Sequence, residues 1–146
     1  MIRKSLLILL FILLGITNAG GNEIKGNIHV TVEKMKNSKG YVKIRLYNSG
    51  EGFPLSGKRS LESRMVPIRE GRADTLFKDL PYGFYALAVL HDENGNGKMD
   101  LKWGFYPSEG AAVSNNPQPG LVPPSFEEAK LVLDSAGLHV KIQMNY

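Results

Sequence analysis

Apolar and polar residues alternate along most of this chain, a pattern typical of β-strands with one buried face. The first alternating run covers residues 24–32 and the second covers 42–47, with a short turn-forming segment between them. We therefore predict that these two runs pair as a hairpin. A second hairpin is predicted from residues 64–69 and 73–77, joined by a turn at Gly71.

The run from Phe84 to Leu90 is different, because both of its alternating faces are apolar. A strand with this composition needs cover on both sides, so we predict that it is the central strand. The expected cover for one face is the long segment 92–126 that follows it, which carries the aromatic residues Trp103, Phe105, Tyr106 and Phe126. Alternation returns in residues 129–133 and 138–146, which predict the last two strands.

About seven strands separated by turns, without an amphipathic helical pattern, indicate an all-β fold. We predict an immunoglobulin-like or transthyretin-like β-sandwich with one long loop, residues 92–126. A structureless segment of that length is uncommon in a compact domain and is often functional.

The first residues have the three parts of a secretory signal peptide. Arg3 and Lys4 precede an apolar run, and small residues end at Ala19, so we predict a signal peptide at 1–19 and a single mature domain at 20–146. The apolar run is shorter than the roughly 20 residues needed to span a bilayer, so no membrane span is expected after cleavage. The expected location is the periplasm, the cell surface or the medium.

The amino-acid composition excludes several kinds of functional site. The chain has no cysteine, which excludes disulfides, thiolate metal sites and cysteine nucleophiles. Its formal charge of +4 falls to +2 once Arg3 and Lys4 are removed with the signal. The remaining basic residues are scattered among acidic ones, so we expect no nucleic-acid binding.

The sharpest chemical signal is the segment 92–100, which follows the predicted central strand. Oxygen-bearing side chains at alternate positions, then a glycine and a second carboxylate, form the spacing of a calcium-binding loop. The predicted ligands are Asp92, Asn94, Asn96, the backbone carbonyl of Lys98, and Asp100. Position twelve of the loop is Trp103 rather than a bidentate Glu, so Glu109 or water would have to complete the shell. The alternative is a solvated turn, since Asn-Gly pairs also favour turns.

A broader set of residues could contact an unknown ligand, such as a carbohydrate or a protein. It comprises His91, Trp103, Tyr106, Glu109, Ser114, Asn115 and Asn116. The aromatic residues of this set could form a platform for a sugar ring or instead cover the central strand, and the Ser-Asn-Asn triplet could instead supply turn hydrogen bonds. We expect a non-enzymatic binding or structural module with a calcium-binding loop. The alternative is a small hydrolase that uses His91 and the 92–126 loop.

The chain also resembles a known bacterial family, the domain of unknown function 2141. The resemblance rests on Glu51-Gly-Phe-Pro54, on the run from Leu80 through His91-Asp-Glu-Asn-Gly-Asn-Gly97 to Asp100, on Ser114-Asn-Asn116, and on Pro123-Pro-Ser-Phe-Glu-Glu-Ala129. It implies a small exported β-sandwich protein and assigns no activity.

Overall fold

The computed structural model describes residues 23–104 and 106–146, so the predicted signal peptide and Phe105 lie outside the described residues. Ten strands occur in this part of the chain: β1 (Lys25–Glu33), β2 (Tyr41–Tyr47), β3 (Glu62–Pro67), β4 (Ala73–Pro81), β5 (Gly83–Asp92), β6 (Leu101–Lys102), β7 (Tyr106–Pro107), β8 (Ala111–Val113), β9 (Leu131–Leu133) and β10 (Gly137–Gln143). The helical elements are a single turn of 3-10 helix, η1 (Gly57–Arg59), and a four-residue helix, α1 (Phe126–Ala129).

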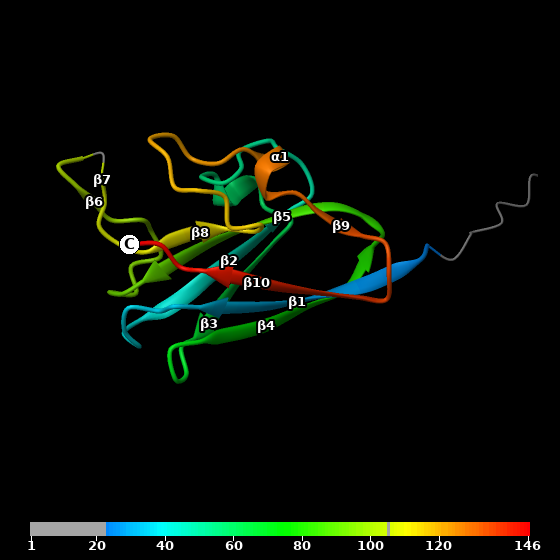
Figure 1. The fold of residues 1–146 in the computed structure, drawn as a ribbon, viewed down its shortest axis with the longest axis horizontal. Helices are drawn as coiled ribbons and strands as arrows, with labels where there is room; N and C mark the ends of the chain where they lie inside the picture. Colours follow the sequence, from blue (N-terminus) through cyan, green and yellow to red (C-terminus); the bar gives the residue numbers. More distant parts are fainter. Residues whose placement is uncertain (1–22, 105) are drawn as a thin grey trace, which may run out of the picture.

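The strands form a β-sandwich, which confirms the predicted fold class (Figure 1). One sheet has three strands in the order β10-β1-β4. The other has five, in the order β3-β2-β5-β8, with β9 pairing with β5 as well. The two sheets together have one strand more than the seven or so that the sequence predicts, and β6 and β7 form a separate small hairpin.

The two predicted hairpins are wrong, because each of them joins strands that belong to different sheets. β1 pairs with β10 and β4, whereas β2 pairs with β3 and β5. The turn around Gly71 does form, with Arg69 and Arg72 exchanging backbone hydrogen bonds of 2.8 and 2.9 Å, but it carries the chain from the large sheet to the small one. Alternation shows which face of a strand is buried, but not which strand pairs with it. The apolar faces of these strands are buried equally well when the strands lie in opposite sheets.

The main core lies between the sheets and is built from the alternating residues that the sequence marks. Every apolar side chain at the inward positions of β1 and β2 is fully buried: Ile28, Val30, Val32, Val42, Ile44 and Leu46. Tyr85, Leu87 and Val89 of β5 enter the same core. The Tyr85 hydroxyl donates a 2.8 Å hydrogen bond to the carbonyl of Pro81, so this buried phenol is satisfied by nearby backbone.

β5 is the central strand, as predicted, and pairs with β2, β8 and β9. On its second face, Ala86 and Ala88 pack in a smaller cluster with Tyr47, Val113 and Ala129, against which Phe53 and Phe126 lie. The aromatic cover therefore comes from the 48–60 connection and from the end of the long segment.

Two expectations about this face are corrected. Trp103 is 82% exposed and does not cover it, and Phe84 at its end is 56% exposed. The prediction of a single long loop is also wrong, because residues 92–126 contain β6, β7 and β8, and β8 extends the large sheet beside β5. Three residues with small or β-branched side chains sufficed for that short strand, which is too brief to show a period in the sequence.

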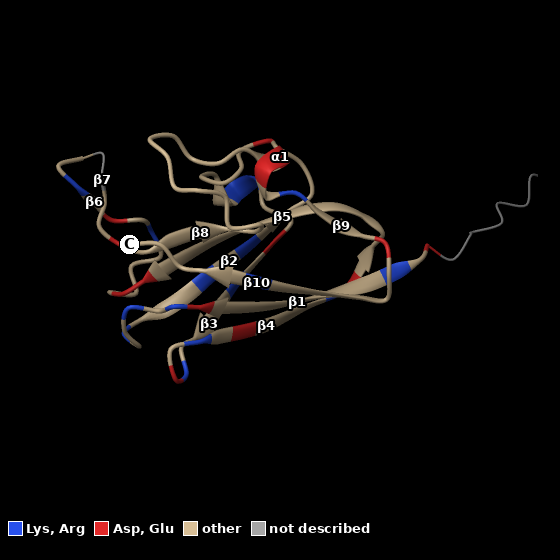
Figure 2. Ribbon diagram, viewed as in Figure 1, with Lys and Arg blue, Asp and Glu red and all other residues tan. Residues whose placement is uncertain are grey.

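Charged residues of both signs are interspersed over strands and loops in the view of Figure 2, without a face of one sign. No helix in residues 23–104 and 106–146 has the length and apolar character needed to cross a membrane.

The packing of Ala88 yields a test of the second face. Replacing Ala88 by Glu would overfill the buried cluster that Ala88 forms with Val113 and its neighbours and would bury an unpaired carboxylate. We expect the free energy of unfolding to fall by at least about 3 kcal/mol. Val132→Glu is the control, since Val132 is half exposed on the neighbouring β9 and should change stability by only about 0.5 kcal/mol. Equal urea midpoints for the two variants would show that the face of Ala88 is open.

Candidate metal-binding loop and the adjoining hairpin

The candidate loop starts at a rigid point, because Asp92 is the last residue of β5 and its side chain is fully buried. Its two carboxylate oxygens accept hydrogen bonds from the backbone N–H groups of Asn96 (3.1 Å) and Gly97 (2.6 Å). Gly97 has a φ of +77°, a conformation that glycine adopts without steric cost. The loop therefore folds back over Asp92 instead of continuing away from the strand.

The remaining predicted ligands form a network around Asp100. The carboxylate of Asp100 accepts hydrogen bonds from the side-chain amides of Asn94 (2.5 Å) and Asn96 (2.9 Å). The amide oxygens of the same residues accept from backbone N–H groups, Asn94 from Asn96 at 3.0 Å and Asn96 from Lys98 at 2.8 Å. The side-chain amides of Asn94 and Asn96 thus donate the hydrogen bonds that the carboxylate of Asp100 accepts within the loop.

Glu109 joins the two ends of the loop. Its side chain is buried, and its carboxylate accepts hydrogen bonds from the backbone N–H groups of Glu93 (2.9 Å) and Asp100 (3.2 Å). The backbone of Ser108 also donates to the carbonyl of Asp100 at 2.8 Å. The base of the β6–β7 hairpin is therefore held by the same residues that close the loop.

Three further groups contact the loop from other elements. Lys43 of β2 donates from its ammonium to the carbonyl of Gly97 at 3.1 Å. A hydrogen bond from the Asn37 amide, with Lys36 at 3.9 Å as a weaker contributor, holds the pKa of Glu93 below its ordinary value. Glu93 therefore favours the folded state above the ordinary carboxyl pKa, and this contribution is lost as the pH falls through the lowered value.

The donor set of the loop is compatible with calcium but is not a dense acidic cluster. Its side chains offer carboxylate and amide oxygens, which are the hard ligands that Ca²⁺ takes. Within residues 23–104 and 106–146, however, no three His, Cys, Asp or Glu side chains are grouped closely enough to hold a metal ion. Any shell must therefore draw on amide oxygens, backbone carbonyls and water beside Asp92 and Asp100.

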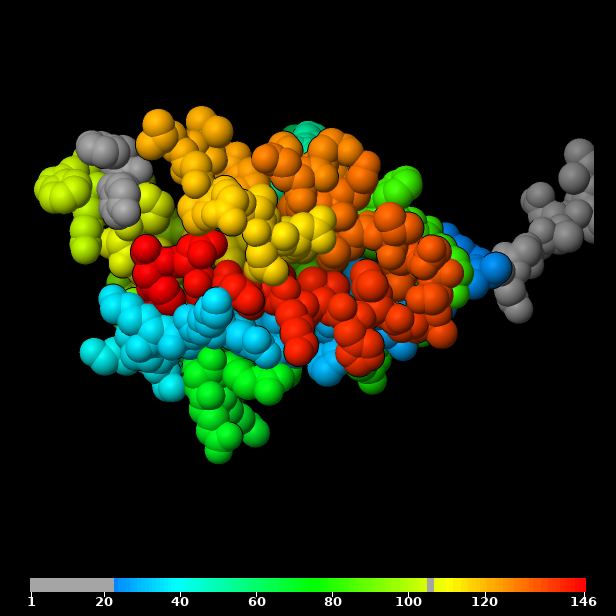
Figure 3. Space-filling model, viewed as in Figure 1, coloured from blue at the N-terminus to red at the C-terminus, as the bar shows by residue number. Residues whose placement is uncertain are grey.

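The β6–β7 hairpin projects from the body of the sandwich (Figure 3). Trp103 and Gly104 form its tip, both with positive φ, and the indole of Trp103 is almost wholly in solvent. The backbone of Tyr106 pairs with Lys102, while the side chain of Tyr106 lies outside the described part of the structure. The aromatic tip is thus displayed at the end of a short arm whose base is the candidate loop.

His91 lies one residue before the loop and is fully buried. Its Nε2 is 2.8 Å from the carbonyl of Lys39, which can only accept, so Nε2 carries the proton. Its Nδ1 then accepts from the hydroxyl of Tyr146 at 2.6 Å, and that hydroxyl accepts from the backbone of Lys36 at 2.9 Å. Burial raises the pKa of Tyr146. Both nitrogens of His91 are thus engaged in holding three segments together.

Ser114 is fully buried at the point where β5 changes partner from β8 to β9. Its hydroxyl accepts from the backbone of Leu87 at 2.9 Å and donates to the carbonyl of Ala129 at 2.5 Å. The side chain therefore supplies backbone groups of β5 and α1 with the partners that no strand provides there.

Asn115 and Asn116 act on the neighbouring elements. The Asn115 amide donates to the carbonyls of Glu128 (3.2 Å) and Lys130 (2.8 Å). The Asn116 side chain pairs with β10, donating to the carbonyl of Lys141 at 3.0 Å and accepting from the backbone of Gln143 at 2.7 Å. The triplet fastens α1, the residue that follows it and β10 to the end of β8, through bonds between distant segments rather than the turn hydrogen bonds that the sequence suggests.

The structure does not bring His91 and Ser114 together as the hydrolase alternative requires. Ser114 bonds to Leu87, and His91 lies four residues further along the same strand, about 13 Å away at the usual rise per residue. The side chains of His91 and Ser114 also make their hydrogen bonds with other partners. Nothing in this geometry favours a hydrolase.

The sequence pattern does not identify several residues that contact the loop or His91. Lys43 reads as an ordinary outward position of a strand, and Tyr146 as the last position of an alternating run. Gly110 gives the one local hint of tight packing, because a Cβ there would lie 2.5 Å from the Tyr146 ring. A glycine before a strand does not say which side chain it accommodates, so the contact needed the fold.

These features define a β-sandwich whose central strand runs into a polar loop and an exposed aromatic hairpin. A family model described as an uncharacterised protein conserved in bacteria (DUF2141) matches residues 30–141, and the chain belongs to this family. No curated protein and no solved structure matches it.

The contacts of His91 lead to a stability prediction. Tyr146→Phe removes the hydroxyl that serves both His91 and Lys36 and leaves a buried ring nitrogen without a partner. We expect the free energy of unfolding to fall by about 1–3 kcal/mol. Tyr41→Phe is the control, because Tyr41 is an exposed tyrosine and should change stability by less than about 0.5 kcal/mol. A Tyr146→Phe protein that melts like the control would show that the hydroxyl does not support His91.

Proposed function

We propose that this chain is an exported binding module in which Ca²⁺ bound at the 92–100 loop orders the hairpin that carries Trp103. The observation that carries the proposal is the double contact of Glu109. One buried carboxylate bonds the backbone at both ends of the loop, and one of those ends is the base of the hairpin. An ion that tightens the loop must therefore also restrain the arm that displays the indole.

The ligands for Ca²⁺ in this proposal are Asp92, Asn94, Asn96, the Lys98 carbonyl and Asp100. Rotation of the two amides would turn their oxygens toward the ion, and the ion would replace the amide donors that now meet Asp100. Only two carboxylates belong to this set, and the ammonium of Lys43 on β2 contacts the Gly97 carbonyl of the loop. Because affinity follows ligand charge and rigidity, we expect a dissociation constant of about 10⁻⁴ to 10⁻³ M.

Calcium binding is tested with the fluorescence of Trp103, which is the only tryptophan in the chain. Calcium should change this fluorescence and raise the melting temperature, with about 1.4 kcal/mol of stabilisation when its concentration is about ten times the dissociation constant. Magnesium should do less, because it demands a stricter octahedron. The measurements compare millimolar Ca²⁺ with chelator.

The informative variant is Asp100→Asn, which removes one charge from the partly exposed end of the loop without touching buried Asp92. It should abolish both calcium effects. Asp134→Asn is its matched control, since Asp134 is exposed in the turn before β10, and it should behave as the wild type. Wild-type curves that coincide with and without calcium would reduce the loop to a turn.

The ligand that we propose for the hairpin is a carbohydrate, bound by stacking of a sugar ring on the indole of Trp103. A protein that packs against Trp103 and half-exposed Leu101 is the other class. A glycan array probed in calcium should give signals with the wild type that Trp103→Ala loses, with Leu121→Ala, another exposed apolar residue, as the control. An array blank with both proteins would oppose the carbohydrate.

Export is proposed from the signal-peptide pattern of residues 1–19. Expression of the full chain in a bacterium should therefore yield a mature protein that begins at Gly20. Mass spectrometry of the periplasmic and medium fractions measures the N-terminus. A cell-associated protein that keeps Met1 and the apolar run would mean that the segment is an anchor and not a cleaved signal.

A further inference from the structure

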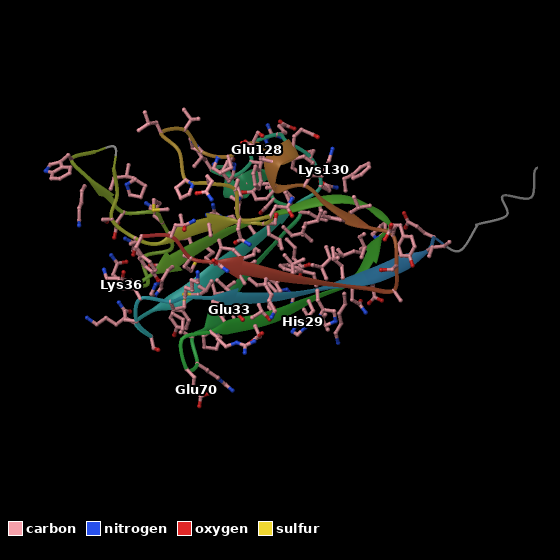
Figure 4. The ribbon with its side chains drawn as sticks, viewed as in Figure 1. His29, Glu33, Lys36, Glu70, Glu128 and Lys130 are labelled. Carbon is pink, nitrogen blue, oxygen red and sulfur yellow. The ribbon has the colours of Figure 1, made fainter. Side chains whose placement is uncertain are left out.

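Two of the three histidines of the chain face each other on the small sheet, whereas His91 lies on β5 of the large sheet. His29 of β1 and His139 of β10 occupy the same rung of the parallel ladder. Their Nδ1 atoms are 3.2 Å apart, and their rings meet edge to face with centroids 5.1 Å apart. Figure 4 labels His29 on β1, the strand that lies between β10 and β4 in this sheet.

The pair lies in an open hollow of about 290 Å³, lined by Asn27, His29, Leu76, Gly137, Leu138 and His139. Gly137 contributes the free space, because no heavy atom lies within 4 Å of the place where its Cβ would be. Leu76 pairs with His29 from the other side, on β4, and forms an apolar wall. The two imidazoles are therefore accessible to an ion and its water, whereas the backbone beneath them is fixed.

The backbone is fixed because both strands are anchored in the main core on either side of the pair. Ile28 and Val30 flank His29 and are fully buried, and Val140 follows His139 into the same core. A slip of one residue would turn these side chains into solvent, so the register that places the histidines opposite each other is strongly specified. The pair is thus preorganised, and little ordering is needed for both rings to act at once.

The separation of the two nitrogens suits a metal ion. Two neutral imidazoles cannot direct both Nδ1 lone pairs at each other, so a proton or a cation must lie between them. Metal–imidazole bonds of about 2.0–2.1 Å, with an angle between 90° and the tetrahedral value, place two ligand nitrogens about 2.8–3.4 Å apart. The 3.2 Å separation of His29 and His139 falls within that range.

We propose that His29 and His139 chelate one divalent transition-metal ion of the class that prefers imidazole, such as Cu²⁺ or Zn²⁺. Both bind through Nδ1, and water fills the open positions on the side of the hollow. Imidazole suits copper, zinc and nickel, whereas Ca²⁺ takes oxygen ligands, so this site is independent of the 92–100 loop. Cu²⁺ should bind more tightly than Zn²⁺, following the general order of stability for nitrogen ligands.

The test titrates Zn²⁺ alone, and then Cu²⁺ alone, into the mature protein at about pH 7.5, because a metal ion binds the neutral form of imidazole. Zinc should shift the NMR signals of the His29 and His139 rings together, saturating at one ion per chain. His91 is an internal control, because both of its nitrogens are engaged in the core, and its signal should stay in place. Calcium should leave all three rings unchanged.

Single substitutions separate chelation from two independent weak sites. His139→Ala and His29→Ala should each lower the zinc affinity at least about tenfold, because each single change already breaks the chelate, and the double variant should lose only the weak residual binding of one imidazole. Lys141→Ala, an exposed change two residues along β10, should bind as the wild type does, and so should Asp100→Asn. Zinc affinity that survives His139→Ala, or zinc shifts confined to His91 or to the 92–100 loop, would overturn the proposal.

Discussion

Burial of both faces of β5 is the constraint on which the rest of this structure depends. Every residue from Tyr85 to Asp92 is buried. One face lies in the core between the sheets, and the other lies beneath Phe53, Phe126 and Ala129. A strand enclosed in this way cannot use water for its backbone hydrogen bonds, so each group needs a partner from the protein. β2 pairs with residues 86–92 along one edge, while the other edge is shared by β8 and β9, with Ser114 filling the gap between them.

The polar loop follows directly from that burial. Asp92 ends the strand while still fully enclosed, and a buried carboxylate is tolerable only when hydrogen bonds compensate it. The backbone N–H groups of Asn96 and Gly97 provide this compensation, and they can reach Asp92 only if the chain turns sharply, which Gly97 permits. The alternating oxygens of the loop are therefore useful to the fold with or without an ion. A loop already closed around its own carboxylates presents oxygens at low cost in ordering.

The sequence was sufficient to predict which face of each strand is buried, but it was insufficient to predict which strands pair. Val30 and Ile44 are inward as the alternation predicts, yet the strands that carry them lie in opposite sheets, because either sheet offers the same apolar surface. The spacing of 92–100 located the candidate loop. Glu109 was suggested only as one way to complete the shell, and its bonds to both ends of the loop depend on the path of a hairpin between them. The contact of Tyr146 with His91 joins residues 55 apart in sequence, and no local pattern encodes it.

The distribution of exposed and satisfied groups bears on where this fold could recognise another molecule. The polar residues that the sequence marks as candidates for ligand binding or catalysis are His91 and the Ser-Asn-Asn triplet. Their side chains instead hydrogen-bond to backbone groups or to other side chains of the fold, so these polar atoms are already engaged. Recognition needs groups that are accessible and held in place at low entropic cost. Trp103 meets the first condition, and its short hairpin, fixed at the base by Glu109, goes part of the way to the second. His29 and His139 meet both, because a parallel ladder with a buried inner face holds them opposite each other. The accessible candidate groups thus lie on the outer surface of the small sheet and on a hairpin beyond the large sheet, away from the enclosed central strand.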